Sequence, residues 1–339
     1  MNLDDFLVAQ LREHRIAGLS LAVISGGDVA KVRCYGFVDQ SEKISIASST
    51  LFQAASISKC LTALAALRLV DQGLLVLDED INPKLQSWKI PRNDFINSSP
   101  VTLRRLLCHN AGFTVHGFRG YAVGEPVPVL TQILDGVPPA NNAAICVDSV
   151  PGANPRYSGG GYTVLQQILI DIVGRPFPEL MQSLVLQPLG MTASTFDQPL
   201  PEALRLGAAT GHAQNGQPIA GGARIYPEMA AAGLWSTSSD LARFVIGIQQ
   251  SLAGRAGSIL SPAGVREMLT PQAAKYGLGP TILGQGQTLQ FIHSGRNAGF
   301  DAVLMGGAAN GKGVVVMVNA NADPKVLNSI LKAVTQESA

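Results

Sequence analysis

The chain has 339 residues, 46% of them hydrophobic, and a formal net charge of +1 at pH 7. A chain of this size can bury a large core in one large domain or two lobes. Its balanced, scattered charges exclude the basic surface of a nucleic-acid-binding protein and the polybasic run of a membrane-surface protein, and no stretch reaches the ~18 uninterrupted apolar residues of a membrane span.

The start of the chain predicts a helix followed by a β-hairpin. Apolar side chains recur at helical spacing in residues 4–15. Residues 18–24 and 28–35 are typical of strands, and Ser25-Gly26-Gly27 between them is a hairpin signal. The first residues lack the basic and apolar regions of a signal peptide. We therefore expect a cytoplasmic protein as the sequence is written, or a periplasmic or secreted one if a leader has been removed.

Ser56 and Lys59 place a hydroxyl and an amine on one face of a helical turn. Residues 57–70 are rich in Ala and Leu without Gly or Pro, and Gly73 ends the run, so Ser56 is expected at or near a helix N-terminus. Residues three apart on a helix are neighbours, so Lys59 could take the Ser56 proton and make the hydroxyl nucleophilic. Backbone N–H groups at such a terminus can hold an oxyanion. For this motif alone, an N-cap serine beside a solvated lysine is the more common arrangement.

The middle of the chain offers a tyrosine and two long loops. Tyr157-Ser158-Gly159 follows a turn-rich stretch. Residues 113–128 and 205–227 carry many Gly and Pro and little periodicity, and long loops of this kind often border a substrate site. His109 and His116 have no partner at a spacing that supports a ligand or catalytic role, so a structural role is expected for both.

Strands and a final helix are predicted toward the C-terminus. The first of three short apolar segments ends in His293-Ser294-Gly295, and the strands are expected at residues 289–293, 301–305 and 313–319. Because strands stand at both ends of the chain and the middle is helix-rich, we predict a mixed α/β fold with an antiparallel sheet built from both termini and flanked by helices. Residues 1–60 and 223–339 would form this α/β domain, and residues 61–222 an inserted, mainly helical one.

A second S-x-x-K, Ser329 to Lys332, serves as an internal control. It lies in residues 324–336, which carry an apolar stripe at helical spacing formed by Val326, Leu327, Ile330, Leu331 and Val334. Ser329 and Lys332 fall mostly toward the polar side. An ordinary amphipathic helix explains this copy.

The four cysteines, Cys34, Cys60, Cys108 and Cys146, are widely spaced, with no C-x-x-C and no histidine pair. This pattern argues against a zinc site. We expect free thiols, with Cys60 as a buried small hydrophobe, and neither a metal nor an organic cofactor.

Taken together, Ser56-Ile57-Ser58-Lys59, Tyr157-Ser158-Gly159 and His293-Ser294-Gly295 resemble the S-x-x-K, Y-x-N and K-T-G signature of the penicillin-binding-protein and class C β-lactamase superfamily of serine hydrolases. The resemblance extends over most of the chain and includes residues 106–112, 186–191 and 233–241. It implies a mixed α/β domain plus a helical domain, with the active site in the cleft between them.

Two departures from that signature bear on the substrate. Gly159 replaces the Asn of Y-x-N, and His293 and Ser294 replace the Lys and Thr of K-T-G. Histidine is mostly neutral at pH 7, so a permanent cation for a substrate carboxylate is missing. An H-x-G motif is more similar to relatives that act as esterases or D-aminopeptidases than to efficient β-lactamases.

The resemblance implies a mechanism in which Ser56 attacks an acyl carbon. Lys59 and Tyr157 form a coupled pair that takes the proton, and the sequence leaves open which one is the base. The backbone N–H groups of Ser56 and Arg296 would form the oxyanion hole, and His293 would join a proton relay beside Tyr157. Substrate contacts are expected from Gly159, Ser294 and Gly295.

For the substrate, we expect a small-molecule ester or amide, and the first expectation is a carboxylesterase acting on small, uncharged esters. A D-amino-acid amidase or peptidase, an acyltransferase and a weak β-lactamase follow in that order. An alternative of another class is a catalytically inert binding protein of the penicillin-binding type. Neither a nucleic acid nor a membrane is expected as a partner, and the sequence leaves the oligomeric state open.

Overall fold

The computed structural model describes residues 2–39, 41 and 44–337, so the outermost residues of the predicted α/β domain lie outside the described part. A six-stranded antiparallel sheet has the order β2-β1-β8-β7-β6-β5. Its strands are β1 (Gly18–Ser25), β2 (Asp28–Gly36), β5 (Thr281–Leu283), β6 (Gln290–Asn297), β7 (Phe300–Gly307) and β8 (Gly313–Val318). Leu19 of β1 pairs with Val318 of β8, which joins the two ends of the chain in one sheet. The predicted mixed α/β class and sheet are confirmed.

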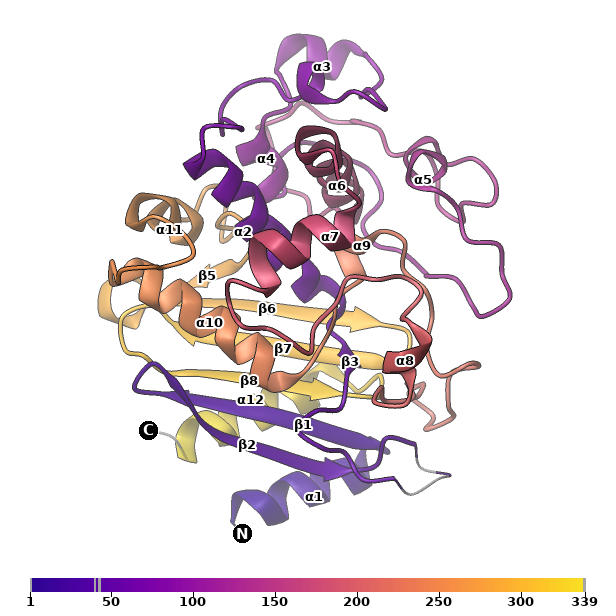
Figure 1. The fold of residues 1–339 in the computed structure, drawn as a ribbon, viewed down its shortest axis with the longest axis vertical. Helices are drawn as coiled ribbons and strands as arrows, with labels where there is room; N and C mark the ends of the chain where they lie inside the picture. The colour runs from indigo at the N-terminus through magenta and orange to yellow at the C-terminus, as the bar shows by residue number, and fades with distance from the viewer. Residues whose placement is uncertain (1, 40, 42–43, 338–339) are drawn as a thin grey trace.

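Helices cover both faces of this sheet (Figure 1). The helices α1 (Leu3–Glu13) and α12 (Pro324–Glu337) pack on one face, and α10 (Ser238–Leu252) packs on the other. Successive side chains of a strand point to opposite faces. Leu19 and Leu21 of β1 therefore join the core under α1 and α12, whereas Ala22 and Ile24 join the larger core on the α10 side. Burial on both faces explains the nearly continuous apolar sequence of β1.

The predicted hairpin between β1 and β2 forms with a two-residue loop. Ser25 pairs with Asp28, and Gly26 and Gly27 have φ values of 63° and 77°. A two-residue turn that follows the twist of its strands needs positive φ at both central residues. Glycine adopts that conformation without steric cost.

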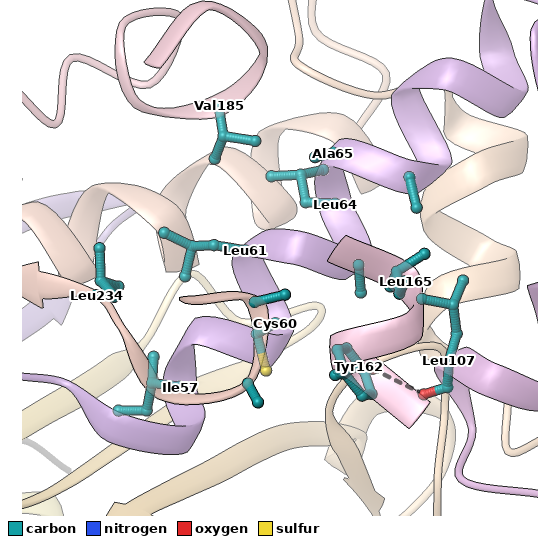
Figure 2. Packing of buried hydrophobic residues seen from close by; sticks show 14 of the residues in the cluster. Ile57, Cys60, Leu61, Leu64, Ala65, Leu107, Tyr162, Leu165, Val185 and Leu234 are labelled. Atoms are coloured by element: carbon teal, nitrogen blue, oxygen red, sulfur yellow. Dashed lines mark hydrogen bonds between the residues drawn. The ribbon is translucent and has the colours of Figure 1, made fainter. Parts of the chain in front are cut away.

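The helix α2 (Ser58–Asp71) runs through the centre of the molecule. Most of its side chains, polar ones included, are buried, as expected of a helix that is apolar on all sides. Figure 2 shows Cys60, Leu61 and Leu64 packed among Leu165, Val185 and Leu234, which come from distant parts of the sequence. The 3₁₀ turn η1 (Ala55–Ile57) leads directly into α2. Ser56 therefore stands at the entrance of a rigid, buried helix, as predicted.

The region between β2 and α10 contains α6 (Gly159–Val173) and several short elements. These are β3 (Phe52–Gln53), η2 (Asn82–Lys84), α3 (Asp94–Ser98), α4 (Leu103–Leu107), α5 (Leu130–Asp135), α7 (Phe177–Met181), η3 (Gln182–Leu186), α8 (Glu202–Arg205), α9 (Met229–Ala232) and β4 (Trp235–Ser236). After α10 come α11 (Pro262–Leu269) and η4 (Gly286–Thr288). All six strands of the main sheet lie outside residues 61–222, yet one buried core extends from Ala22 of β1 to Leu165 of α6. The division into two domains stays a prediction.

Several smaller expectations can be checked directly. The four cysteines are free thiols and Cys60 is buried, as predicted. Ser329 lies in α12, where its hydroxyl donates to Val326 O and Gln10, so the second S-x-x-K belongs to an amphipathic helix. Within residues 2–39, 41 and 44–337, no helix is long and apolar enough to cross a membrane, and no group of three or more His, Cys, Asp or Glu side chains could hold a metal ion.

Candidate active site

Two serines precede Lys59, and their surroundings separate them. Ser58 is fully buried, and its hydroxyl donates to Ala55 O at 2.5 Å and accepts from Leu234 N at 3.0 Å. Ser56 is half-buried and lines a cavity. Ala55 just before it has φ = 50°, a strained conformation for a residue with a side chain. Ser58 therefore holds the turn together, and Ser56 presents its hydroxyl to the cavity.

Lys59 points at Ser56 from one turn further along. Its Nζ donates to Ser56 Oγ at 3.1 Å and to Ala231 O at 2.7 Å, and the side chain is buried. No acidic side chain forms an ion pair with Lys59 in the described part of the chain. Burial disfavours the charged form of an amine. It lowers the pKa of Lys59 to about 7, so a large fraction of the amine is neutral at physiological pH.

Tyr157 completes the cluster from the loop that leads into α6. Its phenol lies near enough to the Ser56 hydroxyl to interact with it, and the Lys59 Nζ lies 5.0 Å from the centre of its ring. Burial raises the pKa of Tyr157 above its ordinary value, although the nearby Ser56 hydroxyl opposes the shift. The structure therefore brings Ser56, Lys59 and Tyr157 together, and burial suppresses the charge of both the amine and the phenol.

His293 on β6 faces the same cavity. Its Nδ1 lies 2.8 Å from Ser294 O. Because a carbonyl oxygen only accepts, Nδ1 carries the proton and Nε2 carries the lone pair. The His293 ring lies 6.4 Å from the Tyr157 ring. Burial and the neighbouring Lys59 lower the pKa of His293 to about 4, so this imidazole is neutral at pH 7.

The strand β6 passes unusually close to η1. Among the described residues, β5 pairs with β6 only at Gln290–Ile292, and η1 packs against β6. A side chain at Gly295 would place its Cβ 2.3 Å from Ala54 O and 2.9 Å from Ser56 N. The glycine of the third motif is therefore required by the approach of β6 to the nucleophile.

A cavity of about 820 Å³ surrounds these groups. Ser294, Gly295 and Arg296 line it, as do His116, Gly117 and Phe118 of the loop at residues 113–128. No residue of the 205–227 loop does so, although all of that loop is described. Of the two loops expected to border a substrate site, the one at residues 113–128 does so.

Gly159 is not brought into the cavity. It is buried at the first position of α6, where its N–H donates to His116 O at 3.0 Å. A Cβ there would meet Phe118 Cε2 at 3.0 Å and His116 O at 3.1 Å. A glycine at this position of Y-x-N thus allows α6 to pack closely against the cavity wall. Gly159, which was expected to contact the substrate, is not among the lining residues.

Charge in the cavity is limited. Asp301 is the one carboxylate among the lining residues, all of which the structure describes. Both of its oxygens accept from Arg296, at 2.7 and 2.6 Å, so the two charges are paired with each other. Lys275 is a second exposed cation among the lining residues. The cavity therefore offers no unpaired carboxylate to a bound ammonium group.

Two histidines for which the sequence predicted a structural role lie next to the cluster of Ser56, Lys59 and Tyr157. His109 is buried with its ring 4.3 Å from the Tyr157 ring, and His116 lies 5.0 Å from it and lines the cavity. Neither has a partner at a recognisable spacing, because the loop fold alone brings them to Tyr157. The one sequence signal was that residues 106–112, which include His109, resembled the superfamily.

The chain is similar in sequence to known proteins. A sequence model of the Beta-lactamase family matches residues 3–336. Curated relatives include "Protein flp" of Staphylococcus aureus (strain N315), 25% identical over 58% of this chain and 38% of that protein, and "Penicillin-binding protein 4" of Amycolatopsis lactamdurans, 27% identical over 59% and 49%. The chain thus spans less than half the length of these curated relatives.

Solved structures show the same fold. An octameric penicillin-binding protein homologue from Pyrococcus abyssi superposes with a TM-score of 0.75 at 24% identity, over 97% of this chain and 75% of that one. SurE, in a crystal structure with D-Leu, gives 0.74 at 23% identity over 98% and 74%.

Proposed function

This chain belongs to the Beta-lactamase family, whose fold is that of serine hydrolases, and from that premise we propose that it is a carboxylesterase acting on small, uncharged esters through an acyl-enzyme on Ser56. The observation that carries the proposal is the 3.1 Å contact between Ser56 Oγ and the buried Lys59 amine. A serine becomes nucleophilic when a base within hydrogen-bond distance removes its proton.

The first step is acylation, with Lys59 as the base. The neutral amine takes the Ser56 proton as Oγ bonds to the acyl carbon, and the ester C–O bond breaks when the tetrahedral intermediate collapses. The proton then passes to the leaving alkoxide. Burial lowers the pKa of Lys59 to about 7 but raises that of Tyr157, which favours the amine as base and the phenol as the group that hands the proton on.

The negative oxygen of the intermediate is proposed to lie between η1 and β6. The first N–H groups of a helical turn have no partner within it, and a strand edge without a neighbour presents free N–H groups. The N–H of Ser56 and that of Arg296 meet these descriptions. Gly295 lets the two N–H groups come together, because a Cβ there would lie 2.9 Å from Ser56 N and 2.3 Å from Ala54 O. Losing one such donor typically costs on the order of 10²–10³ in rate.

Water then hydrolyses the acyl-enzyme. His293 lines the cavity together with Tyr157, and its Nε2 carries the lone pair because Nδ1 donates to Ser294 O. A neutral imidazole with a free lone pair can accept a hydrogen bond, whereas a lysine ammonium at this position would only donate. We assign His293 the role of acceptor in the relay that passes protons between Tyr157, the leaving group and water.

The charges at the third motif support a neutral substrate. His293 is uncharged and Arg296 is paired with Asp301, so the third motif supplies no free cation for the carboxylate of a β-lactam. The same pairing leaves no carboxylate for the ammonium of a D-amino-acid amide. A D-amino-acid amidase or peptidase is nevertheless the second candidate, because a structural neighbour was solved with D-Leu.

The test compares kcat/KM for three chromogenic substrates: p-nitrophenyl butyrate, D-leucine p-nitroanilide and a cephalosporin. Ser56→Ala is the blank, and Ser329→Ala is the matched control because it removes the serine of the other S-x-x-K. We expect the ester to be preferred, with turnover abolished in Ser56→Ala and retained in Ser329→Ala. Preference for the anilide would establish the second candidate, and ester turnover that survives Ser56→Ala would refute the acyl-enzyme.

A further inference from the structure

Both neighbours of Tyr157 in the chain are hydrogen-bonded to one residue, His109. The N–H of Arg156 donates to His109 O at 2.7 Å, and the N–H of Ser158 donates to His109 Nδ1 at 3.2 Å. The backbone on either side of the phenol is thereby fixed to a residue 48 positions earlier in the sequence. His109 itself does not line the cavity.

The imidazole ring also packs against tyrosines. The Tyr157 ring lies 4.3 Å from it, tilted by 36°, and the rings of Tyr162 and Tyr276 lie 5.2 and 5.1 Å away. Tyr162 is in turn held by a 2.9 Å hydrogen bond from its hydroxyl to Leu107 O, drawn as a dashed line in Figure 2. The His109 ring therefore packs against the Tyr157 ring, and the Tyr162 ring beside it is itself held by a hydrogen bond.

The two hydrogen bonds require a particular form of His109. Its backbone has φ = 58°, a conformation that Asn, Asp and His adopt more readily than other residues with side chains. Because Ser158 N–H donates to Nδ1, that nitrogen must be unprotonated. Burial and the nearby Lys59, His293 and His116 lower the pKa of His109 well below its ordinary value, which keeps the ring in the required neutral form.

We propose that His109 is a positioning residue that sets the Tyr157 hydroxyl against Ser56, by accepting the N–H groups on both sides of Tyr157 and by packing against its ring. This inference rests on the proposed function, because it acts on the reaction only through Tyr157. Displacing a catalytic group by about 1 Å can cost on the order of 10²-fold in rate. His109 should therefore affect kcat and leave KM unchanged.

Substitutions can separate acceptor from ring. His109→Asn tolerates the positive φ and places an amide oxygen where Nδ1 stands, whereas His109→Gln places its oxygen further out. His109→Phe keeps a ring without the acceptor. We expect His109→Asn to retain kcat within about 3-fold, and the Gln and Phe variants to lose roughly 10- to 100-fold at constant KM. If the Phe variant does not fold, the Asn and Gln pair decides.

A double-mutant cycle with Tyr157→Phe distinguishes positioning from general destabilisation. Residues that act through one group are not additive, so His109→Gln should cost less than about 3-fold when Tyr157 is already Phe. His212→Phe is the control. This histidine is also buried, with its Nδ1 on Asn319 O, but is not part of the cavity lining, and its effect should be equal in both backgrounds.

The readouts are ester turnover and the rate at which a fluorophosphonate labels Ser56, followed by intact-protein mass. Full additivity of His109→Gln and Tyr157→Phe, or a loss in His109→Asn as large as in His109→Gln, would overturn the proposed role. If instead Ser56→Ala still turns over the ester, or if Tyr157→Phe alone has no effect, the proposed function fails. The two failures are thus distinct.

Discussion

At the scale of single residues, the proposed chemistry depends on keeping the Lys59 amine uncharged. Lys59 is buried and desolvated in the core around α2. Its two hydrogen bonds go to a hydroxyl and a carbonyl, neither of which carries a negative charge. A carboxylate beside it would favour the ammonium. Burial lowers the pKa of Lys59 to about 7, and no ion pair among the described residues opposes that shift.

The pH dependence of the rate follows from this pKa. Because the proposed base is the neutral amine, kcat/KM for p-nitrophenyl butyrate should rise as pH increases, reach half its maximum near pH 7 and stay level above about pH 8. His293, with a pKa of about 4, would contribute only below pH 5. A pH profile of kcat/KM between pH 5 and 9.5 measures this.

Replacing the base supplies the control. Lys59→Ala should lower kcat/KM by roughly 10²- to 10⁴-fold and remove the rise near pH 7, while Lys332→Ala in the second S-x-x-K should leave both unchanged. A rise that persists near pH 7 in Lys59→Ala, or a wild-type profile that shows no plateau and is still rising at pH 9.5, would assign the proton transfer to another group.

The same residues show what a sequence can and does not reveal about a site. Ser56, Lys59, Tyr157 and His293 stand in motifs with fixed spacing, so they could be predicted and the structure brings them together. His109 reaches Tyr157 only through the fold of a loop, and a lone histidine has no spacing to recognise. Gly159 was expected at the substrate because of its motif, but its backbone is needed against His116 O.

At the scale of elements, the contact between β6 and η1 joins the sheet to the nucleophile. Gly295→Ala would put a Cβ 2.3 Å from Ala54 O and 2.9 Å from Ser56 N, and both are backbone atoms that move only with their elements. We expect kcat/KM to fall by on the order of 10²–10³ as the oxyanion donors separate, and the free energy of unfolding to fall by about 1–3 kcal/mol.

Ester kinetics and urea denaturation of Gly295→Ala test this. Gly207→Ala is the control, because its Cβ would lie 3.6 Å from the nearest atom, Leu204 O, and its φ is not positive. It should change neither quantity. Wild-type turnover in Gly295→Ala would show that the spacing between β6 and η1 does not set the oxyanion hole.

Helices and strands could be predicted where the local sequence pattern favours the same structure that the packing of the whole chain requires. The β1–β2 hairpin, the strands β6, β7 and β8 and the helix α12 carry their own periodicity or turn residues, and all form as expected. The two-residue pair of β3 and β4, the π-helical turn η3 and the short helices α3 to α5 carry no such pattern. Their backbone is held by contacts with distant segments, such as Phe52 with Ser236.

At the scale of the whole molecule, the active site is supported by a core that continues from the sheet into the helical region. Glu228 is a buried acidic side chain beside that otherwise apolar core. It is fully buried at the N-cap of α9, and neither side-chain oxygen has a hydrogen-bond partner in the described part of the chain. The same short helix supplies the Ala231 carbonyl that holds Lys59. A buried carboxyl in this setting favours its neutral form.

This carboxyl should make stability depend on pH. Burial raises the pKa of Glu228 to about 8, against about 4.3 in the unfolded chain. The unfolded chain releases this proton first, so the free energy of unfolding should fall as pH rises from about 4 to 8 and change little above that.

Glu228→Gln keeps the shape of the side chain without its charge. This variant should be more stable than wild type by a few kcal/mol at pH 9 and about equal to it at pH 4. Urea denaturation at pH 4, 6, 8 and 9 measures the difference, with the exposed Glu202→Gln as control. If the free energies of unfolding of wild type and Glu228→Gln changed with pH in the same way, the prediction would be contradicted. The folded protein would then stabilise the Glu228 carboxylate as well as water does.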